Sequence, residues 1–123
     1  MKRMILLAFL CTTTLVMAQR INHVQEAIAN YDYEAALTLI AKEKPTIPLL
    51  LQKGKAQRGL GMNTEALSTY QEIIANDTAN TRAYIEAAEC CRSLAKYQQA
   101  LKYYEQALDL NPENKYVRIQ YIG

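Results

Sequence analysis

The sequence is poor in the residues from which most catalytic and metal sites are built. It has one histidine, three cysteines and four glycines in 123 residues. A metal site needs several close ligands, and His23 lies far upstream of Cys90 and Cys91. We find no glycine-rich phosphate loop, no serine elbow and no carboxylate pair beside a histidine. We therefore predict no enzyme, no cofactor and no metal ion.

The chain also lacks a large net charge once its first residues are set aside. Lysine and arginine number 14 and acidic residues 12, but Lys2 and Arg3 belong to the leader described next, which leaves twelve of each sign. A nucleic-acid-binding domain needs a basic face or stripe. We therefore expect no nucleic-acid partner.

Residues 1–18 have the pattern of a secretory signal peptide. Lys2 and Arg3 form a basic start, Met4 to Val16 is mostly apolar, and Ala18 ends the small-residue cleavage pattern. The apolar run is shorter than the roughly 20 residues of a membrane-spanning helix. We expect cleavage near Ala18 and a periplasmic or secreted chain that meets the membrane only through this transient segment.

Cys11 raises the alternative of a lipoprotein signal. Lipid attachment favours small residues before the cysteine, whereas Phe9 and Leu10 are bulky. A signal peptide without lipid attachment is the better interpretation.

Two consecutive segments, 47–80 and 81–114, align without a gap at an offset of thirty-four residues. A unit of this length cannot bury an apolar face alone, so neighbouring units must stack into a solenoid. The identical pairs are Arg58 and Arg92, Leu60 and Leu94, Ala66 and Ala100, Leu67 and Leu101, Tyr70 and Tyr104, and Asn80 and Asn114, and the small-for-small pairs are Gly54 with Ala88 and Gly61 with Ala95.

Within 81–114, apolar residues recur at steps of three and four, which predicts two amphipathic helices. Small residues allow the two helices to approach closely, and Asn111 and Pro112 end the second one. The apolar positions are Tyr84, Ala87, Ala88, Cys91 and Leu94 in the first helix, and Ala100, Tyr103, Tyr104, Ala107 and Leu108 in the second.

This order of large, small and aromatic residues with a closing proline resembles the tetratricopeptide repeat family. The resemblance implies an all-α fold, a right-handed superhelical stack of antiparallel helix pairs. Segment 47–80 follows the pattern with Leu50, Gly54, Ala66, Tyr70 and Ile73. It departs from it because Lys53 and Gln57 replace apolar residues and Thr78 replaces the proline. Pro48 is expected in the first turn of its first helix.

Residues 19–46 are predicted to form a degenerate first helix pair. Tyr33 to Leu37 repeats the pattern of Tyr97 to Leu101, and Ala36 lies thirty residues before Ala66, so the second helix or its turn is shortened. The first helix is expected from about Ile21 to Asn30. Its inward residues are expected to be Ile21, Val24, Ala27 and Ile28.

Residues 115–123 are predicted to start a further or capping helix, with Asn114 as its cap. The apolar residues there are Tyr116, Val117, Ile119, Tyr121 and Ile122. We expect uncovered apolar surface at this end, and therefore self-association through it.

The resemblance implies a protein or peptide partner, of unknown identity, in a groove lined by the first helices. Arg58 and Arg92 occupy equivalent places and could form a basic rail for carboxylates of the partner, or could equally be solvated charges. The candidate groove residues are Leu51, Lys55, Arg58, Arg82, Ile85, Glu89 and Arg92.

Some relatives hold a C-terminal carboxylate with two lysines and two asparagines. Gln25, Gln52 and Glu86 stand where amides and a cation of that clamp would be expected. Binding of chaperone tails is therefore disfavoured.

Cys90 and Cys91 are adjacent, and neighbours in a helix point about 100° apart, which argues against a disulfide. Cys91 is expected to be a buried small residue and Cys90 a partly buried thiol. The Asn76-Asp77-Thr78 and Asp77-Thr78-Ala79 triplets fit glycan acceptor motifs in an exposed turn. Capping of helix ends by Asp77, Thr78 and Asn80 is the favoured explanation.

The sequence as a whole favours an exported, non-enzymatic protein- or peptide-binding repeat scaffold. The alternative is a truncated fragment of a longer array that acts only through self-association.

Overall fold

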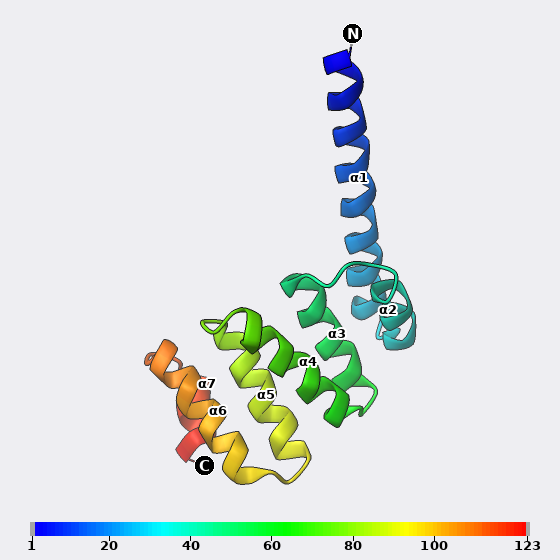
Figure 1. Ribbon diagram of the computed structural model, residues 1–123. Helices are drawn as coiled ribbons and strands as arrows, with labels where there is room; N and C mark the ends of the chain where they lie inside the picture. The colour runs from blue at the N-terminus through cyan, green and yellow to red at the C-terminus, as the bar shows by residue number, and fades with distance from the viewer. Residues whose placement is uncertain (1, 123) are drawn as a thin grey trace.

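The computed structural model describes residues 2–122, with side chains at residue 12 and at 14–121. This part of the chain forms seven α-helices and no strand. The helices are α1 (Lys2–Ala29), α2 (Tyr33–Ile40), α3 (Ile47–Gly59), α4 (Asn63–Asn76), α5 (Thr81–Ser93), α6 (Tyr97–Leu110) and α7 (Lys115–Ile122). Figure 1 shows α2 to α7 stacked along the molecule while the first turns of α1 project away from it. The all-α stack of antiparallel helix pairs is confirmed.

One turn geometry joins the two helices of each of the first three pairs. Tyr31, Gly61 and Ala95 have φ angles of 59°, 75° and 59°, in the left-handed region. Each lies five residues before the small residue that starts the packing of the second helix, namely Ala36, Ala66 and Ala100. The degenerate first pair therefore has the same plan as the two clearer ones.

Small residues set the spacing between helices in the main core, which runs from α3 to α7. Ala100 is 2% exposed and Tyr104 is 1% exposed, so both lie in the helix contacts that the period predicts. In the preceding unit Tyr70 packs on Gly54 so closely that a Cβ there would lie 2.5 Å from its Cζ. A second, smaller core joins α1, α2 and α3 through Val24, Ile28, Ala36, Ile40, Leu49 and Ala56.

Gln57, one of the two polar residues of α3 that depart from the repeat pattern, has a specific partner. Gln57 is buried, and its Oε1 accepts a hydrogen bond of 2.6 Å from Thr69 Oγ1. In the next unit the same two positions hold Cys91 and Tyr103. A hydrogen-bonded pair thus stands where the next unit has a thiol and an aromatic ring. Pro48 lies in the first turn of α3 as predicted.

The prediction for the first helix was partly wrong. Val24 and Ile28 are buried, but α1 is continuous from Lys2 rather than starting near Ile21, and Ile21 is 41% exposed. The reason is the length of α2: this helix has only eight residues, so it covers α1 from Val24 onward and little before it. None of the described helices has the length and apolar content needed to cross a membrane.

The helix predicted after Asn114 is present as α7. Asn114 Oδ1 accepts a hydrogen bond of 3.1 Å from the Val117 amide, which is the expected cap, and Val117 is fully buried. Tyr116, Ile119 and Tyr121 remain exposed. The predicted Ile122 lies outside the described side chains.

The turn between α4 and α5 is held by caps. Asn80 Oδ1 accepts from the Ala83 amide, and Asp77 accepts from Ala79 and from Asn80 Nδ2. The side chain of Thr78 is exposed, whereas its carbonyl accepts a hydrogen bond from the Tyr84 hydroxyl. Asp77 and Asn80 therefore have the capping role predicted for them, and Thr78 contributes through its backbone.

The cysteine prediction needs one correction. Cys90 and Cys91 are free thiols, as expected, but both are fully buried, so Cys90 is not the partly exposed group that was predicted. Burial raises the pKa of Cys90 to about 11 and also raises that of Cys91. In the described part of the chain, no three metal-ligating residues group to hold an ion.

Candidate functional site

The candidate binding residues come from the first helices of two successive units. Leu51, Lys55 and Arg58 belong to α3, and Arg82, Ile85, Glu89 and Arg92 belong to α5. Steps of three and four residues place each set along one side of its helix. We call the surface made by these residues, together with the exposed Tyr116 and Ile119 of α7, the first-helix face.

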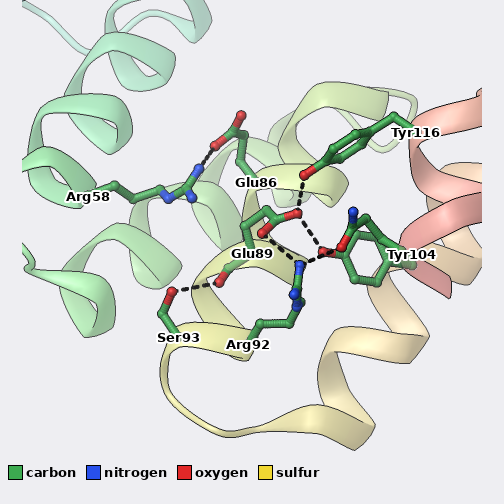
Figure 2. A network of polar contacts seen from close by, with 8 residues as sticks. Arg58, Glu86, Glu89, Arg92, Ser93, Tyr104 and Tyr116 are labelled. Atoms are coloured by element: carbon green, nitrogen blue, oxygen red, sulfur yellow. Dashed lines mark hydrogen bonds and ion pairs between the residues drawn. The ribbon is translucent and has the colours of Figure 1, made fainter. Parts of the chain in front are cut away.

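The side chain of Arg58 is engaged in an ion pair within the chain. Its Nη1 forms an ion pair with Glu86 Oε2, which joins α3 to α5 (Figure 2). Burial opposes the charge on Arg58, but the charge and hydrogen bond of Glu86, together with the nearby Cys90 and Tyr70, outweigh burial and raise the pKa of the guanidinium. The pair is thus a link between two units.

Glu89 is the centre of a second polar cluster. Its Oε1 accepts hydrogen bonds of 2.6 Å from both the Tyr104 and the Tyr116 hydroxyls, and its Oε2 lies 3.3 Å from Arg92 Nη1. Figure 2 shows the two tyrosines converging on this carboxylate from α6 and α7. The cluster therefore ties three helices together.

The charge state of Glu89 follows from these partners. Burial alone would raise the pKa of its carboxyl, but the hydrogen bonds from Tyr104 and Tyr116, together with the nearby Arg92 charge, outweigh burial and lower it. Burial and then the Glu89 hydrogen bond raise the pKa of Tyr104, and the same hydrogen bond is the main cause that raises the pKa of Tyr116. Near neutral pH, Glu89 is ionised and both hydroxyls are protonated.

Arg92 repeats the contact made by Arg58. Its Nη1 donates a hydrogen bond of 2.6 Å to Gln120 Oε1, and both contacts span twenty-eight residues of sequence. The sequence revealed the equivalence of the two arginines but not their acceptors. Glu86 and Gln120, the two acceptors, are themselves thirty-four residues apart. This spacing could have indicated that each arginine meets the equivalent residue of the following unit.

The remaining candidates have a different environment. Lys55 and Arg82 are exposed, and neither belongs to an ion pair among the residues that the structure describes. Leu51 and Ile85 are half-buried and pack against the main core. The structure thus brings the predicted residues onto one face. It places Arg58 and Arg92 in contacts within the chain, whereas the sequence suggested either a basic rail for the partner or solvated charges.

A separate cavity of about 410 Å³ lies between α2, α3 and α4. It lies beside α2, which has eight residues whereas α4 and α6 have fourteen each. Leu37, Ile40, Leu49 and Leu50 line it together with Lys53 and Glu72. Lys53 and Lys55 point about 200° apart around the helix axis, so this cavity is not part of the first-helix face.

The stacked antiparallel helix pairs place this chain in the class of helical-repeat solenoids. Residues 81–114 match the sequence model described as tetratricopeptide repeat. This segment is a tetratricopeptide repeat. No curated protein matches its sequence.

Solved structures with the same fold extend over most of the chain. PcrH of Pseudomonas aeruginosa, in complex with the chaperone binding region of PopB, has a TM-score of 0.75 at 17% identity over 87% of this chain and 90% of PcrH. The Arabidopsis OM64 TPR domain gives 0.78 at 16% identity over 85% and 90% of the two chains. The first TPR of Spaghetti (RPAP3), bound to the HSP90 peptide SRMEEVD, gives 0.77 at 22% identity over 82% and 83%. At these identities the likeness concerns the fold.

Proposed function

We propose that the first-helix face binds a segment of another protein, without catalysis, in the cell envelope or after secretion. The observation that carries the proposal is the gathering of exposed cations and half-buried apolar side chains of α3 and α5 on one face. Two solved structures of the same fold, PcrH and Spaghetti (RPAP3), hold a partner segment or peptide, which supports a peptide-binding role. The proposed location rests on the signal-peptide pattern of residues 1–18.

Photo-crosslinking in the native host tests the surface. A benzophenone amino acid placed at Ile85, on the first-helix face, is expected to capture a discrete partner. The same group at Lys102, which is exposed on α6, is the matched control and should capture none. The purified partner should then bind the purified chain in calorimetry, and Leu51→Ser with Ile85→Ser should weaken that binding. Equal capture from both positions would contradict the proposal.

A second candidate function is self-association alone, as a fragment of a longer array. The observation in its favour is the exposed apolar surface of α7 at Tyr116, Ile119 and Tyr121. In that case the benzophenone at Ile85 would capture no other protein, and the chain would cross-link only to itself.

A further inference from the structure

The charges of the first-helix face largely cancel in pairs. Arg58 pairs with Glu86, and Arg92 pairs with Glu89. Lys55 and Arg82 are left over: both are exposed, and no ion pair within the described residues involves either of them. This face therefore has an uncompensated positive charge, although the chain after residue 18 is neutral overall.

The repeat predicts that the two leftover cations are neighbours. Tyr116 and Glu89 meet through a hydrogen bond of 2.6 Å, which joins α7 to α5. The residues thirty-four positions earlier are Arg82 and Lys55, at the corresponding contact between α5 and α3. The hydroxyl and the carboxylate of the first contact are thus replaced by two positive charges at the equivalent positions of the second. Two neighbouring cations repel each other, and both attract an anion.

A second observation agrees with this position of Arg82. Tyr70 packs on Gly54, the residue next to Lys55. Burial, then the Glu86 charge, raises the pKa of Tyr70, and Arg82 is among the cations that oppose this rise. The charge of Arg82 therefore reaches Tyr70, whose ring lies against the residue next to Lys55.

Apolar side chains flank the two cations. Leu51 lies one helical turn before Lys55, and Ile85 lies one turn after Arg82, and both are half-buried. Beyond them the face continues to the exposed Tyr116 and Ile119 of α7. A ligand that matches this surface has a carboxylate with apolar groups on either side.

We propose that Lys55 and Arg82 form a subsite for a side-chain carboxylate of the partner, within a segment that alternates acidic and apolar residues. Leu51 and Ile85 contact the apolar residues next to that carboxylate. The inference rests on the proposed function of the first-helix face and names the chemistry of its partner.

The carboxylate belongs to a side chain rather than to a chain end. The face extends past the subsite to α7, so a partner that ended there would leave Tyr116 and Ile119 uncovered. A terminal carboxylate would also need more donors nearby, but Glu86 is acidic and already engaged by Arg58.

Three synthetic peptides test this on the full chain by calorimetry. The first has about ten residues of glutamate, leucine and serine, with both ends blocked. The second replaces glutamate with glutamine, and the third is the glutamine peptide with a free C-terminal carboxylate. Only the blocked glutamate peptide is expected to bind, and raising the salt from about 0.05 M to about 0.5 M should weaken its binding about tenfold. No binding of the glutamate peptide, or preference for the free C-terminus, would overturn the inference.

Charge-reversal variants locate the binding. Lys55→Glu with Arg82→Glu should weaken the glutamate peptide by about tenfold or more. Lys44→Glu with Lys102→Glu changes the net charge equally at exposed sites off the face, and should change affinity by less than about twofold. All four residues are exposed, so both variants should fold, as circular dichroism can verify. Equal losses in the two variants would show that only overall charge matters and would refute the subsite.

The two proposals can fail separately. If the benzophenone at Ile85 captures a partner while the glutamate peptide does not bind, the first-helix face is a binding surface and the acidic subsite is wrong. If neither result appears, both proposals are wrong.

Discussion

At the residue scale, Gly54 shows two physical effects that oppose each other. Helix propensity alone predicts that Gly54→Ala would stabilise α3 by about 1 kcal/mol. However, the new Cβ would lie 2.5 Å from the ring of Tyr70, which is buried and cannot easily move. We expect overpacking to dominate and the free energy of unfolding to fall by about 1–3 kcal/mol in urea denaturation.

A double-mutant cycle isolates the cause. In a Tyr70→Leu background the ring is absent, so Gly54→Ala should become neutral or stabilising. The same loss in both backgrounds would mean that the ring contact is not responsible. Ala75→Gly, at an exposed position of α4, measures the effect of helix propensity on the free energy of unfolding without a packing contact.

The buried thiols give a second prediction at this scale. Burial raises the pKa of Cys90 to about 11 and raises that of Cys91, so both stay protonated and shielded at pH 8. An aromatic disulfide reagent should not react with the folded chain on the time scale of a free thiol, and should react with both after unfolding in urea. Rapid labelling of Cys90 in the folded chain would contradict the burial described.

At the scale of single elements, α7 depends on polar contacts as well as on Val117. Tyr116→Phe removes the hydrogen bond to Glu89, which should cost about 1 kcal/mol. Hydrogen exchange of the α7 amides should become faster. Tyr121→Phe is the matched control, because no hydrogen bond of its hydroxyl is found within the described residues, and it should leave exchange unchanged.

The same contact predicts a dependence on pH. The pKa of Glu89 is lower in the folded chain than in the unfolded one, where it is about 4.3. Its contribution to stability is therefore complete above pH 4.3 or so and is lost as the pH falls through the lower, folded value. As the pH is lowered below about 4, the urea midpoint of unfolding should fall less in Glu89→Gln than in the unmodified chain. An equal fall in both proteins would argue against a role for this carboxylate.

Elements differ in how far the sequence could predict them. The thirty-four-residue period located α3 to α6 because the same small and aromatic residues recur in each unit, and Asn114 marked the start of α7. The start of α1 could not be predicted, since a leader and a following helix can join without a break. The contacts of Arg58 with Glu86 and of Arg92 with Gln120 were missed because a polar contact between units depends on how the units stack, which periodicity within one unit does not specify.

At the scale of the whole molecule, the position of the expected cleavage site agrees with the packing. Leu15, Val16 and Met17 are exposed, whereas the first residue of α1 in the core is Val24. Among the side chains that the structure describes, removing residues up to 18 would therefore take away exposed apolar groups and no member of the buried core. We expect mass spectrometry of the protein from its native host to show a chain that starts at Gln19. Retention of Met1 in cytosolic material would contradict export.

The other end of the stack determines the last prediction. Tyr116, Ile119 and Tyr121 of α7 are 50%, 66% and 41% exposed, so apolar surface persists even though Val117 is buried against the preceding pair. Apolar surface gathered on one helix favours association. Sedimentation at tens of micromolar should therefore show dimers or larger species, and Ile119→Lys with Tyr121→Glu should shift the chain toward monomer. Tyr31→Glu with Leu60→Lys also replaces two exposed apolar residues, but in turns far from α7, so it should leave the association intact. A monomeric unmodified chain would show that α7 alone does not drive self-association.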